Sequence, residues 1–509
     1  MSDLGLCSVM GAEGYGALEA ARGFLAATPG AELLRGVGAP VFSVPEARHP
    51  AKRWFQASYG RAAEPSGEDL LAGLGLFYVA ENRRLYLDCT AGHYQMTWGY
   101  AHPELQALAI EAMQHGIVWD NHSNIPQAPV KQLAARLVEI ANCGVGSVEC
   151  QVPDQGPSGC HPQASSLEGV PVSCPPPSPS TEAVEGGTHR SLPLRTRHLD
   201  TALLGICTGS VACAAAIKIA LLHYAKEKKG RGSPAFIVLD GNYHGTDLFA
   251  QRLRGMWPEY FTNVEVAAVQ PNAPEELEAA FARLGERVAA FWAEPVMMNR
   301  EAIAVEPEYL QLARRLCHNA GALMAIDEIQ TGFWFPEVMM FRRLGIVPDL
   351  LVLGKGMTAG FHPLSALLYN SRLDCLAQYD AISTNGNAAL AAVVGLGCIA
   401  LIERHAAEIG RVGERYHGRM AALCEEFPEL LAEVRGAGHM SGLKFRRRED
   451  ALGFHRAALE RGLWVRAHAY HEGHSAVLTK FALPLGDAVA DFAVNAFRQL
   501  LEDCPWRKA

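Results

Sequence analysis

Two short apolar runs that each end in a charged residue place the strongest constraint on the fold of this chain. Residues 323–326 end in Asp327, and residues 350–353 end in a Gly-Lys-Gly turn centred on Lys355. Short apolar runs bounded by turn residues predict buried strands, and the segment between these two is too long for a hairpin turn. We therefore expect a parallel sheet whose strands are joined by long crossovers.

A parallel sheet would place a carboxylate and an amine at the carboxyl ends of two strands, where open α/β sheets bind their ligands. Burying Asp327 and Lys355 is costly unless a bound group compensates both charges. A pyridoxal phosphate ring would do so, because the aspartate holds the pyridine nitrogen protonated and the lysine forms a Schiff base. Taken alone, Asp327 is more often a helix N-cap, and Lys355 is a solvated turn residue. A phosphate-loop lysine is excluded, because Gly356 stands where that motif has Ser or Thr.

The composition indicates a large globular protein with more than one domain rather than a binder of nucleic acid or membranes. Its 509 residues are 49% hydrophobic and carry a net charge of −9, with no concentrated basic segment. The 13 cysteines are scattered without zinc-type pairs, so we expect neither a disulfide framework nor a metal site. Residues 1–40 contain several acids, and Lys218 interrupts the most apolar window, 202–222. We expect no targeting segment, no membrane span and a cytoplasmic protein.

Strand and helix patterns alternate over residues 200–370, which predicts a mostly parallel α/β sheet with a smaller α+β unit after residue 376. We expect an N-terminal arm and part of the small domain in residues 1–100, a large cofactor-binding domain in 101–375 and a C-terminal small domain in 376–509. Strands are expected at 76–80, 84–88, 201–206, 235–239, 289–293, 443–445 and 463–467. Helices are expected at 102–114, 130–140, 208–224, 307–320, 388–403 and 487–502.

Residues 144–198 differ in composition from the rest of the chain. They are rich in Pro, Ser and Gly and have almost no periodic apolar content. Such a segment buries too little surface to offset its ordering entropy, so we interpret it as a disordered surface insertion or an error in the gene model. Its cysteines and histidines are irregularly spaced, so no zinc site is expected.

Several sequence blocks occur in an order that is typical of one enzyme family. The blocks are CTGSVACAAAIKIA, GNYHG, AEPV, IDEIQTGF, PDLLVLGKG and STNGNAALAA. Together they resemble the class III aminotransferases, pyridoxal-phosphate enzymes of fold type I, over most of residues 80–500. The resemblance implies a homodimer with its active site at the subunit interface. It also implies a small-molecule amino donor and a keto acceptor as partners.

The resemblance assigns roles to individual residues. Lys355 is similar to the Schiff-base lysine and Asp327 to the partner of the pyridine nitrogen. The other implied cofactor contacts are Gly209 and Ser210 at the phosphate, Thr384 from the partner subunit, Tyr243 and Ile329 on the two ring faces, and Gln330 near the ring hydroxyl. Without the family, these residues are turn formers or core residues. His244 is either support for the cofactor pocket or a member of a local hydrogen bond.

The chain departs from the family where the substrate is expected to bind. Lys480 aligns with the arginine that clamps a substrate carboxylate, and Glu294 matches the glutamate that pairs with this arginine. A lysine offers a point charge in place of the two-pronged guanidinium, so any pairing with Glu294 would have a different geometry. Tyr94, Trp98 and Trp54 are candidates for lining the substrate pocket, with core packing as the alternative.

These features predict a pyridoxal-phosphate-dependent aminotransferase that moves an amino group between an amine or amino acid and a keto acid or aldehyde. Two alternatives stay open. The first is another reaction of the same cofactor on the same fold, catalysed by an aminomutase, racemase, decarboxylase or lyase. The second is a non-catalytic relative that acts as a binding protein.

Overall fold

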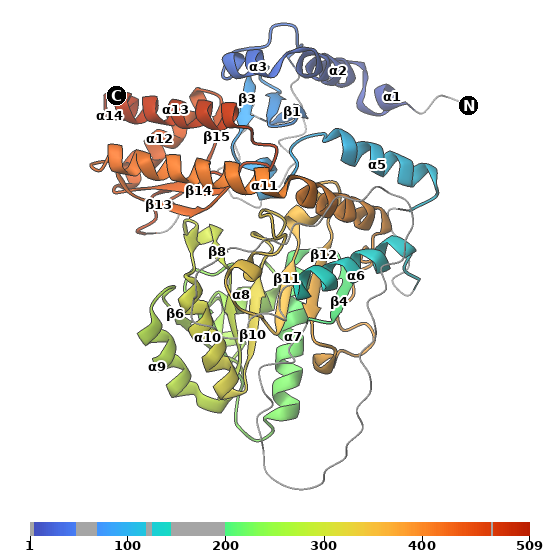
Figure 1. Ribbon diagram of the computed structural model, residues 1–509, viewed down its shortest axis with the longest axis vertical. Helices are drawn as coiled ribbons and strands as arrows, with labels where there is room; N and C mark the ends of the chain where they lie inside the picture. The colour runs from blue at the N-terminus through green and yellow to red at the C-terminus, as the bar shows by residue number, and fades with distance from the viewer. Residues whose placement is uncertain (1–4, 47–68, 119–124, 144–198, 470–471, 509) are drawn as a thin grey trace, which may run out of the picture.

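A seven-stranded sheet forms the centre of the larger part of the molecule. The computed structural model describes residues 5–46, 69–118, 125–143, 199–469 and 472–508 (Figure 1). In spatial order the strands are β4 (Thr201–Ile206), β12 (Ser365–Tyr369), β11 (Leu350–Leu353), β10 (Leu323–Asp327), β7 (Val288–Ala293), β5 (Ala235–Leu239) and β6 (Glu265–Val269). Of these, β12 is antiparallel to both of its neighbours and the remaining pairs are parallel. The expected mostly parallel sheet is confirmed.

Helices cover both faces of this sheet, and alternate residues of each strand point to opposite faces. On one face, Phe236, Trp292 and Val352 pack with the alanine-rich side of α7 (Gly209–Glu227). On the other face, alternate strand residues belong to a larger apolar cluster with helices from several parts of the chain. These helices are α6 (Ala128–Asn142), α9 (Pro274–Leu284) and α10 (Pro307–Ala320). Because both faces are covered, the central strands β10 and β11 are apolar except for Asp327 at the end of β10.

Two small sheets occupy the other end of the molecule. One contains β13 (Leu431–Ala437), β14 (Met440–Phe445), β17 (Ala476–Leu478) and β16 (Arg466–His468). The other contains β1 (Leu70–Leu74), β2 (Phe77–Ala80), β3 (Leu85–Asp88) and β15 (Leu463–Trp464). Since β15 pairs with β3 in parallel, residues from both ends of the chain share one sheet. This pairing supports the assignment of residues 1–100 partly to the small domain, which stays a prediction.

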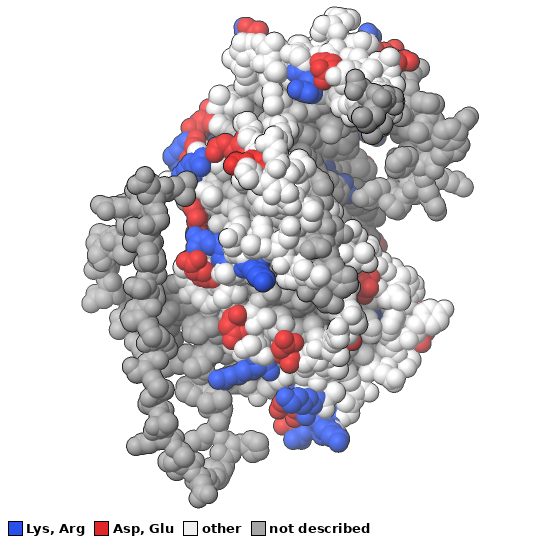
Figure 2. Space-filling model, turned by 90° about the vertical axis from the view of Figure 1, so that its right-hand side faces the viewer, with Lys and Arg blue, Asp and Glu red and all other residues white. Residues whose placement is uncertain are grey.

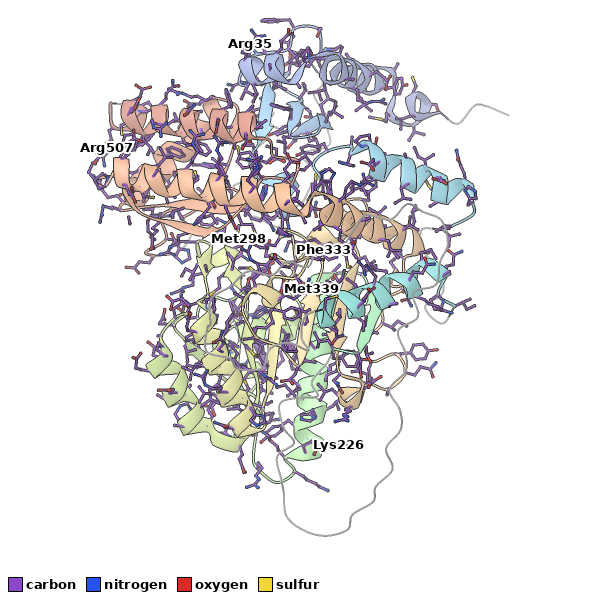
Figure 3. The ribbon with its side chains drawn as sticks, viewed as in Figure 1. Arg35, Lys226, Met298, Phe333, Met339 and Arg507 are labelled. Carbon is purple, nitrogen blue, oxygen red and sulfur yellow. The ribbon has the colours of Figure 1, made fainter. Side chains whose placement is uncertain are left out.

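Further helices surround these small sheets (Figure 1). They are α1 (Leu6–Met10), α2 (Ala12–Ala27), α3 (Gly30–Gly36), α5 (Pro103–Gln114), α11 (Ala389–Glu426), α12 (Arg448–Glu460), α13 (Asp487–Asp503) and α14 (Pro505–Lys508). The labelled side chains Met298, Phe333 and Met339 are buried between these helices and the large sheet (Figure 3). On the face shown in Figure 2, acidic and basic side chains are interspersed.

Helix α11 is far longer than the predicted helix over 388–403. Its first half carries the apolar residues on which the prediction rested, and most of these are buried in the core. Its second half is polar, but Arg411, Arg415 and Arg419 lie one turn apart and face α13. There they form ion pairs with Asp487 and Asp491. This ladder of charges explains why the helix continues where the apolar pattern weakens.

Other predicted segments differ from the structure or lie outside it. The single strand expected over 463–467 is two strands in different sheets, separated at Val465. Strands β6 and β12 were not expected, because their apolar runs carry no adjacent motif. The insertion at 144–198 and Trp54 lie outside the described residues.

A buried ion pair fixes α10 to the large sheet. Arg314 Nη1 lies 2.5 Å from Asp349 Oδ2, and both side chains are less than a tenth exposed. The same carboxylate accepts a hydrogen bond from the backbone N–H of Met324 at 2.8 Å. Asp349 immediately precedes β11, so the pair joins α10 to the start of both central strands.

Replacing Arg314 with methionine should destabilise the protein by about 3 kcal/mol, because the substitution leaves the Asp349 carboxylate buried without its counter-ion. Denaturant unfolding followed by circular dichroism measures the change. Arg283→Met is the matched control: its ion pair with Glu265 is more exposed, and exposed pairs contribute at most about 1 kcal/mol. Equal losses in the two variants would contradict the role of the buried pair.

Candidate active site

Five loops at the carboxyl ends of the large sheet converge on one cavity of about 410 Å³. Asp327 is the last residue of β10, and Lys355 follows β11. Glu294 follows β7, and His244 lies in the loop after β5. Thr208 lies between β4 and α7. The volume is within the range of small-molecule sites, roughly 300–1,000 Å³, and the position is where a parallel sheet gathers its ligand-binding residues.

Asp327 is the most constrained side chain in the cavity. Its Oδ2 accepts a hydrogen bond from His244 Nδ1 at 2.8 Å, and Oδ1 accepts one from the backbone N–H of Ile329 at 2.9 Å. Cys213 Sγ lies 3.5 Å from Oδ2. Although burial lowers the pKa of His244, the hydrogen bond to Asp327 and its negative charge raise that pKa above the ordinary value. The buried imidazole therefore holds the carboxylate in one orientation.

The Cys213, His244 and Asp327 ligand atoms lie within 4.8 Å of one another, the spacing of a metal site. In this structure the same atoms are joined to each other by hydrogen bonds, which use the lone pairs that a metal would need. Burial and the neighbouring Asp327 also raise the pKa of the Cys213 thiol, so the thiolate that a metal prefers is disfavoured. The cluster therefore has the chemistry of a hydrogen-bonded support.

Lys355 lies in strained backbone beside this cluster. Its φ of 42° is in the left-handed region, which is uncommon for a residue with a side chain. Burial lowers the pKa of its amine, while the negative charges of Asp327 and Glu294 oppose the shift. Strained residues concentrate at functional sites, where the surrounding structure fixes them. The result is a buried amine with a larger neutral fraction than an exposed lysine.

Glu294 is a second buried carboxyl group in the cavity. It accepts a hydrogen bond from the backbone N–H of Tyr243 at 2.8 Å. Burial and the charge of Asp327 raise the pKa of Glu294 to about 7, against the opposing charges of His244 and Lys355. Among the described residues no ion pair joins Glu294 to Lys480, because the lysine amine donates to the carbonyl of Gln330 at 2.6 Å instead. The substrate role inferred for Glu294 and Lys480 stays a prediction.

One end of the cavity has the geometry of an anion cradle. Helix α7 begins at Gly209 directly after the cavity-lining residues Cys207 and Thr208, so its first N–H groups and its dipole face the cavity. A Cβ atom at Gly209 would lie 2.4 Å from Ile329 Cδ1, so a larger residue here would force the Ile329 side chain to move. Ser210 Oγ accepts a hydrogen bond from the backbone N–H of Thr246 at 3.1 Å, which ties the loop after β5 to the helix end.

Most of the site residues inferred from sequence line this cavity. They are Gly209, Ser210, Tyr243, His244, Glu294, Asp327, Ile329, Gln330 and Lys355. Residues that sequence reasoning missed also line it, chiefly Gln95, Cys207, Thr208, Thr358, His362 and Ser365. These residues lie in loops or at strand ends, where the sequence has no periodic pattern. The one sequence signal that could have found them is that they lie close in sequence to the ends of predicted strands.

Four of the inferred residues that the structure describes do not line the cavity: Tyr94, Trp98, Thr384 and Lys480. Tyr94 is buried behind it, and Thr384 is exposed on the loop where the backbone N–H of Ser383 donates to the carbonyl of Gly205 at 2.8 Å. Lys480 is fully buried. Its Nζ donates to the carbonyl of Gln330 at 2.6 Å.

Lys480 is held behind the cavity wall. Its Nζ lies 4.2 Å from the ring centroid of Trp334 and 5.6 Å from that of Tyr94. Burial and the charge of Lys355 lower the pKa of Lys480 well below the usual range for a lysine. An amine that is fully buried and already donates to the carbonyl of Gln330 is poorly placed to bind a carboxylate. In this structure Lys480 supports the residues behind the cavity.

The comparisons with known proteins agree on one family. A family model described as Aminotransferase class-III matches residues 195–501. The acetylornithine aminotransferase of Neisseria meningitidis serogroup B is 30% identical over 244 residues, 46% of this chain and 60% of that protein. The putrescine aminotransferase of Pectobacterium atrosepticum is 26% identical over 274 residues, 51% of this chain and 57% of that protein. The chain thus spans less than two thirds of the length of these curated relatives.

The fold also matches solved structures. The crystal structure of a transaminase from the marine bacterium Virgibacillus has a TM-score of 0.70 at 17% identity. That match covers 91% of this chain and 98% of the other. At this level of identity the likeness concerns the fold.

Removing the Glu294 carboxyl should change how stability depends on pH. In the cofactor-free protein its pKa is raised to about 7, from an ordinary value of 4.5. Between these pH values the unfolded state releases the proton and the native state keeps it, so this group lowers stability as the pH rises. Relative to the wild type, Glu294→Gln should therefore gain about 3 kcal/mol between pH 4.5 and pH 7.

Denaturant unfolding of both proteins across this pH range measures the difference. Glu286→Gln is the control, because Glu286 forms an exposed ion pair with Arg231. If the free energy of unfolding changed with pH in the same way in wild type and Glu294→Gln, the Glu294 carboxyl would have an ordinary pKa in the folded protein, and the prediction would be wrong.

Proposed function

The chain belongs to the class-III aminotransferase family, and from this premise we propose that it is an active pyridoxal-phosphate-dependent aminotransferase. It would move an amino group between an amine or amino acid and a keto acid or aldehyde. The observation that carries the proposal is the placement of Lys355 in one cavity with the hydrogen-bonded pair of Asp327 and His244. Without a functional reason, burying these groups together would only destabilise the protein.

The residues of the cavity fit the cofactor of this family. Asp327, held by His244, would face the pyridine nitrogen, and Lys355 would bond to the aldehyde carbon. Ile329 and Tyr243 would contact the two ring faces, with Gln330 near the ring hydroxyl. The cradle at the start of α7, with Gly209 and Ser210, would take the phosphate. When bound, the cofactor supplies an aldehyde that condenses with amines and a ring that accepts electrons from the adjacent carbon.

The protein's own groups would then position and move protons. The low-polarity surroundings of Lys355 favour its neutral amine, which can take a proton from the reacting carbon and return it. Asp327 supplies a fixed negative charge whose orientation depends on His244. Glu294, whose pKa is raised to about 7, is only partly ionised near neutral pH and so adds less negative charge than an exposed glutamate would.

The functional unit is proposed to be a homodimer. Thr384 is exposed and lies outside the cavity of its own chain, although the family places the equivalent threonine at the phosphate. A second subunit would bring its Thr384 loop to the first subunit's cavity. The free cysteines among the described residues are consistent with a cytoplasmic enzyme, which we propose as its location.

Lys355→Ala should remove the absorbance that depends on the lysine–cofactor bond and abolish turnover of amino donors, because no other described residue that lines the cavity supplies an amine. Borohydride reduction of the wild type followed by peptide mapping should place the label on Lys355. A label on another lysine, or wild-type protein that gains no chromophore with added cofactor, would refute the proposal.

A panel of keto acids separates transamination from the other reactions. A transaminase needs an external keto acceptor to complete its cycle, whereas a racemase or aminomutase does not. Turnover of an amino donor that continues at full rate without any acceptor would favour those alternatives. Cofactor binding with no turnover of any amine would favour a binding protein.

Mixing two inactive variants tests the shared site. Lys355→Ala removes the covalent bond, and Thr384→Glu should repel the phosphate of the neighbouring subunit. A mixed dimer contains one site with an intact Lys355 and an intact Thr384, so co-refolding the variants should restore part of the wild-type activity. If Thr384 serves its own chain, the mixture should stay inactive.

A further inference from the structure

A short left-handed turn flanks the cavity. Four consecutive residues, Ala91 to Tyr94, have positive φ angles of 47°, 57°, 65° and 73°. For residues with a Cβ atom this conformation costs roughly 1–2 kcal/mol each. The following residue, Gln95, lines the cavity. Strain in this turn therefore sets the position of side chains beside the reacting groups.

The strained turn is held from two sides. The buried Asp88 carboxylate accepts hydrogen bonds from the backbone N–H groups of Thr90 and Gly92, each at 2.7 Å. The backbone N–H of Lys480 donates to the carbonyl of Cys89 at 2.8 Å. Lys480 Nζ also lies 3.4 Å from the carbonyl of Tyr94. Lys480, which the family pattern suggested for carboxylate binding, thus forms hydrogen bonds with the backbone on both sides of this turn.

The turn presents His93 to an arginine from a distant strand. Arg466 in β16 donates from Nη1 to His93 Nδ1 at 2.9 Å. Arg466 is partly buried. Within the described part of the chain, no carboxylate forms an ion pair with Arg466. A partly buried guanidinium without a counter-ion is unfavourable unless a ligand supplies the negative charge.

The bond to Arg466 fixes the chemistry of His93. Arginine only donates, so His93 Nδ1 is the acceptor and the neutral ring carries its proton on Nε2. Loss of surrounding water, together with the positive charges of Arg466, Lys355 and Lys480, lowers the pKa of His93 to about 4. His93 is therefore a neutral donor. The N–H groups of Arg466 that do not bond to His93, together with the Nε2–H of His93, form a set of donors two residues along the chain from Gln95, which lines the cavity.

We propose that Arg466 and His93 bind a carboxylate group of the substrate in place of the residue at position 480. This inference rests on the proposed function and narrows it: the preferred partners are amino acids and keto acids rather than simple amines and aldehydes. The guanidinium fork matches a carboxylate, and His93 adds a neutral donor. The strained turn keeps His93 aligned with Arg466, and Lys480 stabilises that turn from behind.

Calorimetric titration of the cofactor-loaded protein with glutarate tests the proposal, with 1,5-pentanediol as the uncharged probe. Glutarate should bind the wild type and the diol should not. Arg466→Gln should weaken glutarate binding by about tenfold or more, the effect of losing a charge-assisted hydrogen bond. Arg466→Lys keeps the positive charge but loses the two-pronged guanidinium, so its glutarate affinity should lie between those of the wild type and Arg466→Gln. Arg461→Gln is the matched control, since it removes an exposed charge that pairs with Asp503.

Two results would overturn the proposal: no glutarate binding by the wild type, or equal affinity in wild type and Arg466→Gln when both show the same circular dichroism and unfolding midpoint. Failure of the proposed function looks different. In that case glutarate binding would still depend on Arg466, while no amino donor would change the absorbance of the bound cofactor.

Discussion

The burial of opposite charges in one cavity is the constraint on which the rest of this structure depends. Asp327, Glu294 and Lys355 are each costly to remove from water. Hydrogen bonds hold the two carboxyl groups there: His244 Nδ1 donates to Asp327 at 2.8 Å, and the backbone N–H of Tyr243 donates to Glu294 at 2.8 Å. The parallel sheet makes this arrangement accessible, since its strands deliver residues from distant positions to a single edge. The surrounding apolar layers then exclude water and strengthen each electrostatic interaction.

A second buried cluster fixes the small sheets relative to that cavity. Glu301 lies in the loop between β8 (Val296–Met297) and β9 (Ile303–Ala304). These two strands follow Glu294, just after the chain leaves strand β7 of the large sheet. Its carboxylate accepts hydrogen bonds from Lys444 Nζ at 2.8 Å and from the backbone N–H of Ser475 at 2.5 Å. Lys444 belongs to the sheet that also carries Arg466, and Ser475 immediately precedes strand β17 of that sheet. The position of the proposed carboxylate site thus depends on an ion pair remote from the chemistry.

Much of the framework was predictable from the sequence because each central strand is a short apolar run between turn residues. Strand β11 matches its predicted bounds, as does helix α10, and β10 extends one residue further to include Asp327. Strand β12 was not predicted, because its apolar run carries no adjacent motif, and its antiparallel direction is not visible in the run either. The length of α11 depends on ion pairs with α13, which no local pattern contains.

The site residues also differ in how far they could be predicted from local sequence. Residues inside contiguous blocks, such as Asp327 and Lys355, were identified from their neighbours in sequence. The direction of Lys480 was not, because alignment gives the position of a residue but not the groups that surround its amine. The pairing of His93 with Arg466 joins two segments separated by most of the chain. The left-handed turn that presents His93 contains only one glycine, so its composition gave no sign of its conformation.

The pairing of β3 with β15 also bears on how the protein is made. Strands β1 to β3 leave the ribosome early, yet the strand that covers the edge of β3 is synthesised only after residue 460. Until then that edge has unpaired backbone groups that invite pairing with other chains. The nascent chain therefore cannot complete its N-terminal sheet in order of synthesis, and its most aggregation-prone interval spans the translation of the entire large sheet.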